Sequence, residues 1–404
     1  MTPAPAGDSA RQPRPDSVGR LRSIDAFRGA CALAVFLTHW FLWANFYPQG
    51  EAQRLLHDGL GIVYDLFCRL TWNSGGQHPA VLGFFVLSGF CIHASRARRP
   101  APAINSPEWP RYFLGRGRRI LPVYWWGALL GAGFVLLQTA WPVPNPILNV
   151  HAAGGGRDLL VRVFALTAIV PGDVIYGNWT LNTVSTEMAI YALYPLLFLG
   201  TRRFGWAPPL LGLIALQVVA LVIAPQVSPY WIVNTPLVMG AYWYVGMLAA
   251  EWQFRRALVL PGWAPLLAWG LFLALRETPD FPARYLVVQL VRSLGFAAVL
   301  LWLVGRETRR PSLGRSLTGR FLCLAGEVSY SLYAVHTPVI LATTWALGRW
   351  PGSHGNALQL LLTLLTCVAG TALTYRFIER PFLRSRPAAI FPSTPPAASA
   401  PAGP

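Results

Sequence analysis

Two side chains that could take part in acid–base chemistry stand on one face of the first apolar segment. Arg28 and His39 are eleven residues apart. In an α-helix this spacing is about three full turns, or ~16 Å of rise, so both side chains point the same way at different depths. A charged side chain in a bilayer costs at least ~2.5 kcal/mol, which favours a polar cavity inside the protein. The alternative is that Arg28 reaches the cytoplasmic interface and His39 is a packing histidine.

A second basic group precedes the third apolar segment. Arg116 and Arg119 are three positions apart and would share one face of a helix. Guanidinium groups bind phosphates through paired hydrogen bonds, and an acyl-CoA donor presents a 3′-phosphate and a pyrophosphate from the cytoplasm. The pair therefore predicts a site for donor phosphates. A topology signal that contacts anionic lipid headgroups is the alternative.

Two further ionisable residues lie within later apolar segments, Glu187 and His336. If Glu187 faces His39, its carboxylate would hold the imidazole in one tautomer and raise its basicity, so we predict an orienting role. A carboxylate that is favoured by the positive end of a helix dipole is the alternative. His336, beside Tyr330 and Tyr333, would either bind substrate or form a hydrogen bond between helices, and the sequence leaves both open.

The composition is that of a polytopic membrane protein. Of 404 residues, 54% are hydrophobic and only 12% are charged, whereas roughly a quarter of the residues are charged in soluble domains. The formal charge is +17, and all 33 basic residues are arginines. They cluster between apolar segments, as the positive-inside rule requires, so we do not expect a nucleic-acid partner. The five cysteines form no C-x-x-C pair, and neither a metal site nor a disulfide framework is predicted.

The apolar segments predict ten transmembrane helices, at about residues 23–46, 80–95, 120–141, 181–200, 207–225, 231–250, 258–275, 285–304, 321–347 and 357–378. Two further apolar pieces, 60–70 and 159–170, are shorter than the ~20 residues that a span requires. Connections rich in arginine alternate with connections that have few, which places both termini in the cytoplasm. Residues 1–22 and 381–404 are predicted to be disordered cytoplasmic tails around a membrane domain at 23–380.

Together these motifs resemble the acyltransferase-3 family of integral membrane O-acyltransferases. In family order across about residues 22–385, the resemblance rests on Arg28 with His39, the run Phe84–Phe90 around Ser88, Arg116 with Arg119, Trp179 with Glu187, the run Ser329–His336, and Glu379-Arg-Pro. The spacing from Trp179 to Glu187 is longer than is usual in the family. The resemblance implies transfer of an acyl group, commonly acetyl, from cytoplasmic acyl-CoA to a hydroxyl of a cell-envelope glycan, a lipid-linked sugar or a small natural product.

We therefore predict an all-α, multi-pass O-acyltransferase of the plasma (inner) membrane. The predicted catalytic residues are His39, as either the base or a relay of the acyl group, and Glu187. The predicted substrate-binding residues are Arg28, Ser88, Arg116, Arg119, Trp179, Tyr330 and His336. The expected partners are acyl-CoA as co-substrate, a carbohydrate or lipid-linked acceptor, and membrane lipids.

No metal or redox cofactor is expected, because acyl transfer needs a base and stabilisation of an oxyanion. The acceptor, the length of the acyl chain and a homo-oligomeric state are left open. The competing prediction is a non-enzymatic transporter or flippase for an envelope lipid or glycan precursor, in which the polar stripe would line the route.

Overall fold

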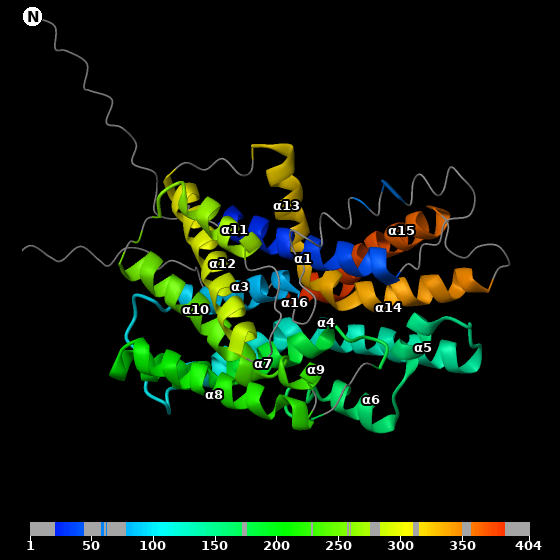
Figure 1. The fold of residues 1–404 in the computed structure, drawn as a ribbon, viewed down its shortest axis with the longest axis horizontal. Coiled ribbons are helices and arrows are strands. Elements are labelled where there is room, and N and C mark those ends of the chain that lie inside the picture. Colours follow the sequence, from blue (N-terminus) through cyan, green and yellow to red (C-terminus); the bar gives the residue numbers. More distant parts are fainter. Residues whose placement is uncertain are drawn as a thin grey trace, which may run out of the picture.

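The computed structural model describes residues 21–43, 58–59, 62, 78–171, 176–227, 229–256, 258, 260–274, 283–309, 315–349 and 357–383. Within these ranges the regular structure is helical and contains no strand (Figure 1). The prediction of an all-α fold is therefore confirmed for the described residues. The predicted tails and the apolar piece at 60–70 fall almost entirely outside them.

The described elements follow one another along the chain as α1 (Arg22–Trp43), α3 (Pro79–Ala94), α4 (Glu108–Ala140), α5 (Pro146–Ala152), α6 (Gly156–Val163), α7 (Leu181–Phe204), α8 (Ala207–Val227), α9 (Pro229–Ile232), α10 (Pro236–Arg255), α11 (Ala264–Ala274), α12 (Ala283–Arg309), α13 (Leu317–Glu327), α14 (Ser329–Gly348), α15 (Ala357–Thr374), the π-helical turn η2 (Tyr375–Glu379) and α16 (Arg380–Leu383).

Membrane character is evident in the longest of these helices. Among the described residues, four segments are long and apolar enough to cross a bilayer, namely Glu108–Ala140, Leu181–Phe204, Tyr285–Arg309 and Ala357–Leu383. Two shorter helices are also apolar, Pro79–Ala94 and Ala207–Ile223. The chain is therefore a membrane protein, while the count of ten spans and the cytoplasmic termini stay predictions.

The helix α4 begins at Glu108, about three turns before the predicted start at residue 120. Arg116 and Arg119 consequently lie inside this 33-residue helix, which agrees with the shared helix face that their spacing predicts. The prediction started the helix where the apolar run starts. Arginine is a good helix former, however, so a membrane helix can continue past the apolar core on an arginine-rich turn.

The single helix predicted at 321–347 is two helices, which is a correction. The first, α13, ends at Glu327, and α14 begins at Ser329. Figure 1 shows α13 at a steep angle to α14. Gly326 and the β-branched Val328 lower the helix propensity at this point. Gly326 also lies against α1, where a Cβ atom would stand 1.9 Å from the carbonyl oxygen of Asp25. The break therefore lies beside the start of α1.

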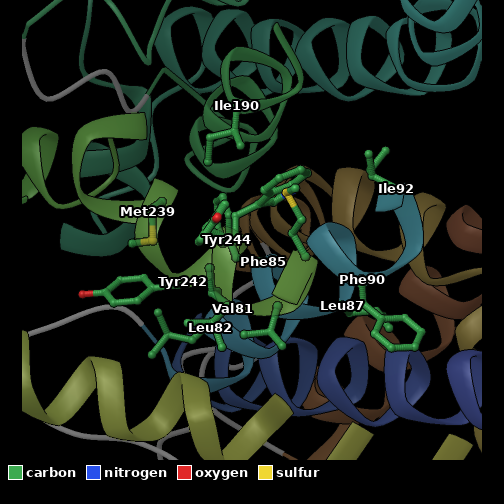
Figure 2. Packing of buried hydrophobic residues seen from close by; sticks show 14 of the residues in the cluster. Val81, Leu82, Phe85, Leu87, Phe90, Ile92, Ile190, Met239, Tyr242 and Tyr244 are labelled. Carbon is green, nitrogen blue, oxygen red and sulfur yellow. The ribbon is translucent and has the colours of Figure 1, made fainter. Parts of the chain in front are cut away.

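The centre of the protein is built on the crossing of α3 and α10. Apolar side chains of α3, such as Leu82 and Phe90, are buried in the main hydrophobic cluster (Figure 2). The two backbones touch at glycines. A Cβ atom at Gly89 would stand 2.0 Å from the carbonyl oxygen of Trp243, and one at Gly246 would stand 1.9 Å from that of Val86. Small residues at such crossings allow the close backbone approach that membrane helices use for packing.

Asn178 connects the segment before α7 to two other helices. Pro338 within α14 has no N–H group, which leaves the carbonyl of Ala334 without its usual helical partner. The side-chain amide of Asn178 donates to that carbonyl oxygen at 2.8 Å and to the carbonyl oxygen of Gly127 in α4 at 3.0 Å. Asn178 is fully buried. It therefore holds α4, α14 and the start of α7 in register.

Candidate active site

A cavity of about 150 Å³ lies among α1, α3, α4, α7, the α13–α14 break and η2. The residues predicted from the sequence that line it are Arg28, Ser88, Arg116, Arg119, Glu187 and Tyr330. The structure thus brings six predicted residues from five helices to one place. His39, His336 and Trp179 are not among its lining residues.

Three arginines supply positive charge to the cavity wall. Arg28 lies 3.4 Å from the carboxylate of Asp25, one turn earlier in α1. The guanidinium group of Arg116 lies over the rings of Tyr112 and Tyr191, 5.8 Å from each centroid, and such contacts hold a cation by the ring quadrupole. Within the described part of the chain, neither Arg116 nor Arg119 makes an ion pair with a carboxylate. Their N–H donors can therefore bind an incoming anion.

Two cavity carboxylates are held by neutral donors. Glu379, which is buried, accepts hydrogen bonds from the backbone N–H of Ser331 at 3.1 Å and from its hydroxyl at 2.5 Å. Glu187 accepts a hydrogen bond from the hydroxyl of Tyr191, one turn along the same helix. In the sequence analysis Glu379 was given only as part of the family resemblance and was not placed in the cavity wall. The π-helical turn η2 presents it there, and such turns are frequent at functional sites.

A chain of hydrogen bonds leads through the wall to Glu187. The indole N–H of Trp243 donates to the Ser88 hydroxyl oxygen at 3.1 Å, and that oxygen lies 2.9 Å from the Tyr191 hydroxyl. Indole can only donate and an ionised carboxylate can only accept. The hydroxyl of Ser88 therefore donates to Tyr191, and Tyr191 donates to Glu187. This chain fixes the polar face of α3 and α7 that borders the cavity.

The predicted pairing of His39 with Glu187 is replaced by a different one. Nδ1 of His39 lies 2.9 Å from Nε2 of His336, and the two rings are nearly parallel, with 10° between their planes. Glu187 instead bonds Tyr191. Nδ1 of His336 lies 3.0 Å from the carbonyl oxygen of Leu332. Both ring nitrogens of His336 are thus engaged within the protein, and the contact with His39 is the hydrogen bond between helices that the sequence left open beside substrate binding.

Tyr333 connects the cavity to the histidine pair. It lines the cavity, and its ring centroid lies 5.9 Å from that of His336 and 5.7 Å from that of Phe84, another lining residue. Its hydroxyl lies 2.5 Å from that of Thr183. In the sequence analysis Tyr333 was mentioned beside His336 but was not predicted as a site residue. The spacing of three residues, which places both side chains on one helix face, was the available signal.

The predicted Trp179 lies outside the cavity wall, yet its neighbours in the sequence hold the site together. The hydroxyl of Thr180 donates to the side-chain oxygen of Asn178 at 2.8 Å and lies 3.3 Å from the carbonyl oxygen of Tyr333. Trp179 itself is half-buried. The sequence reading missed Asn178, although the residue stands directly before the tryptophan motif. Asn178 is important because it donates to the carbonyl of Ala334 in α14, and this contact is visible only in the folded structure.

Helix α6 is held against α4 and against Asn178, which precedes α7, through a buried arginine. The guanidinium group of Arg162 in α6 donates to the carbonyl of Asn178, and the carbonyl oxygen of Arg162 accepts from the hydroxyl of Tyr124 at 2.6 Å. Burial lowers the pKa of Arg162 to about 10. Burial, together with the nearby Arg162, lowers the pKa of His151 in α5 to about 4, so that this histidine is neutral at pH 7.

This arrangement offers an imidazole pair and an arginine-lined cavity, with Tyr333 in contact with both. A neutral imidazole can remove a proton from a hydroxyl, and guanidinium groups can bind phosphate. Within the described residues, no three or more His, Cys, Asp or Glu side chains are arranged to hold a metal ion. The chemistry that these groups offer is proton transfer beside a bound anion.

A comparison with known protein families matches residues 21–376, nearly the whole chain, to the acyltransferase-3 family model, which is described as an acyltransferase domain. The matched region contains all the residues predicted for the site. No curated protein and no solved structure matches the chain.

Proposed function

Because the chain belongs to the acyltransferase-3 family, we propose that it moves an acyl group, acetyl in the simplest case, from cytoplasmic acyl-CoA to a hydroxyl group. The proposed acceptor is a cell-envelope glycan, a lipid-linked sugar or a small natural product. Membership of this family makes the chain an acyltransferase that does not transfer amino-acyl groups. The alternative of a non-enzymatic transporter or flippase therefore has no further support.

The observation that carries the proposal is the cavity that brings Arg28, Arg116 and Arg119 together from two helices. Arg116 and Arg119 make no ion pair within the described residues, so their guanidinium groups can take the phosphates of the donor in paired hydrogen bonds. Arg28, on the neighbouring helix α1, would face the same anion from the side.

The base in this proposal is His39. The acceptor oxygen forms a bond to the acyl carbonyl carbon, the carbon–sulfur bond breaks, and the electron pair goes to the sulfur of CoA. The proton of the hydroxyl passes to His39 and then to that sulfur, so the products are an ester and the CoA thiol. A positioned general base contributes about 10² to 10⁴ in rate.

The acyl arm would have to reach the histidine pair along Tyr333, which lines the cavity beside Phe84 and whose ring also contacts that of His336. Tyr330 contributes its ring to the cavity, because its hydroxyl donates to the carbonyl of Ile120 at 2.8 Å. In the proposed mechanism Glu187 belongs to the wall of the donor cavity and does not orient His39, since its partner is Tyr191.

We propose the plasma (inner) membrane as the location, with the donor bound from the cytoplasmic side and the acceptor from the other side. Acyl-CoA is a co-substrate, and the proposed reaction needs no metal or redox cofactor, because a base and a site for the oxyanion suffice. Membrane lipids would surround the apolar helices.

The proposal can be tested with membrane vesicles that contain the protein and are supplied with radiolabelled acetyl-CoA. We expect ester-linked label to accumulate in envelope material, with one CoA thiol released for each ester formed. Vesicles from cells without the protein are the control. Equal labelling in both preparations would contradict the proposed activity. So would the absence of ester-linked label when acetyl-CoA is saturating.

A further inference from the structure

We infer that His336 is a positioning residue that sets the tautomer of His39 and places the lone pair of the base on Nε2. The inference rests on the proposed function in one respect, that His39 removes a proton from the acceptor hydroxyl. The assignment of the tautomer itself depends only on the hydrogen bonds around the two rings.

The tautomer of His336 is determined by its neighbour in the previous helical turn. Nδ1 of His336 lies 3.0 Å from the carbonyl oxygen of Leu332, and a carbonyl oxygen can only accept a hydrogen bond. If Nδ1 were unprotonated, its lone pair would face a lone pair of the Leu332 carbonyl oxygen. This arrangement would be unfavourable because only 1% of His336 is exposed and water cannot separate the two atoms. Nδ1 therefore carries the hydrogen, and in the neutral ring Nε2 holds the lone pair.

The tautomer of His39 follows from that of His336. The lone pair on Nε2 of His336 faces Nδ1 of His39 at 2.9 Å. Nδ1 of His39 must therefore carry a hydrogen and donate it. A neutral imidazole has one N–H group, so the lone pair of His39 lies on Nε2. Two hydrogen bonds thus run in one direction, from His39 to His336 and from His336 to Leu332.

The orientation of the His336 ring is also fixed by packing. The ring of Phe36 meets that of His336 edge-on, with centroids 6.2 Å apart, and Tyr333 meets it at 5.9 Å on another side. The hydroxyl of Thr337 lies 3.5 Å from Nε2 of His336, a weaker contact than the 2.9 Å bond to His39. A ring held in this way can orient His39 without touching a substrate.

Two substitutions of similar polarity separate positioning from simple packing. In His336→Gln the side-chain amide reaches the place of Nε2, and its oxygen can accept from His39. In His336→Asn the shorter amide reaches only the place of Nδ1, so it can donate to Leu332 but cannot reach His39. In metal sites, the loss of a partner that orients a ligating histidine costs about 10- to 100-fold in activity, and we expect a similar loss here.

With acetyl-CoA as the donor and labelled envelope ester as the readout, we expect kcat per folded enzyme to fall about 10- to 100-fold in His336→Asn. It should stay within about threefold of wild type in His336→Gln, because that amide retains the hydrogen bond. The KM for acetyl-CoA should be unchanged in both, because His336 does not line the donor cavity. Equal kcat values in the two variants would overturn the inference.

Nitrogen NMR of the full-length protein with isotope-labelled histidine provides a readout independent of activity. The signals of His39 are assigned by their loss in His39→Gln. We expect a protonated Nδ1 and an unprotonated Nε2 in the wild type and in His336→Gln, with a shift toward protonated Nε2 in His336→Asn. A wild-type spectrum with Nε2 protonated would overturn the inference. If transfer were absent but the tautomers were as described, the proposed function would fail and the positioning would stand.

Discussion

The Nη2 atom of Arg28 lies 3.9 Å from the thiol sulfur of Cys91, and both residues line the cavity. Cys91 can therefore report on occupancy. In a variant that retains Cys91 as its single cysteine, CoA at ten times its Kd should slow alkylation by a thiol reagent about tenfold, because only the unoccupied fraction reacts. The matched control retains Cys323, which is partly exposed and does not line the cavity. Its alkylation rate should not depend on CoA, and equal protection of both thiols would contradict the placement of the donor.

Arg116 and Arg119 should account for much of the affinity for the donor. Replacing both by Ala removes charge-assisted hydrogen bonds worth about 1.5–3 kcal/mol each, so we expect CoA binding to weaken about 100-fold or more. Isothermal titration of the purified protein measures this. The control is the double replacement of Arg111 and Arg118, which are exposed on the same helix and do not line the cavity. If the two double variants bound CoA equally well, the arginine cavity would not be the donor site, and an inverted topology would indicate a lipid-headgroup anchor.

The close approach of α3 and α10 should make one glycine critical for stability. In Gly246→Ala the new Cβ would stand 1.9 Å from the carbonyl oxygen of Val86, a backbone atom that cannot move without separating the helices. We expect a loss of about 3 kcal/mol or more, as in severe overpacking. Gly133→Ala in α4 is the control, since no atom lies within 4 Å of the added Cβ. Thermal unfolding in detergent should show a lower Tm only for Gly246→Ala, and equal Tm values would contradict the tight crossing.

Much of the fold was predictable, because apolar segments of about 20 residues in a membrane protein have few alternatives to a helix. The predicted helix bounds differ from the structure at two places. The arginine-rich turn before residue 120 is helical although it is polar, and the segment predicted as one helix at 321–347 is broken at Val328, where Glu327 and Ser329 interrupt the apolar residues. Hydropathy indicates whether a segment lies in the membrane, but it does not give the residue at which a helix begins, ends or is interrupted.

The candidate site was predictable in part. The helical spacing of Arg28 and His39 places both on one face of α1, and the family resemblance identified the arginines that share the cavity with Arg28. The partner of His39 was not predictable in this way. Spacing within one helix gives the direction of a side chain but not the rotation of a distant helix against it. In the sequence analysis Glu187 was named as that partner, whereas packing places His336 of α14 beside His39.

The membrane topology is a prediction that reporter fusions can check. Fusions after residues 22, 150, 255 and 380 should report inside, outside, inside and inside, because the connections rich in arginine remain in the cytoplasm. The fusion at 150 falls in α5, between the long α4 and the short α6. An outside signal at 380 would show an odd number of spans between residues 22 and 380 and would contradict the predicted count of ten.

The central claim, that His39 is the base of an acyl transfer, is tested most directly by the transfer rate of His39→Gln. The measurement is the rate at which label from radiolabelled acetyl-CoA enters envelope material, per folded enzyme, at saturating donor. Glutamine can retain a hydrogen bond, so we expect the fold and the CoA affinity to be kept and transfer to fall by about 10² or more. His93→Gln is the control, because His93 is a buried histidine that bonds Glu251 and does not line the cavity. Transfer at the wild-type rate in His39→Gln would contradict the claim and make His39 a packing residue.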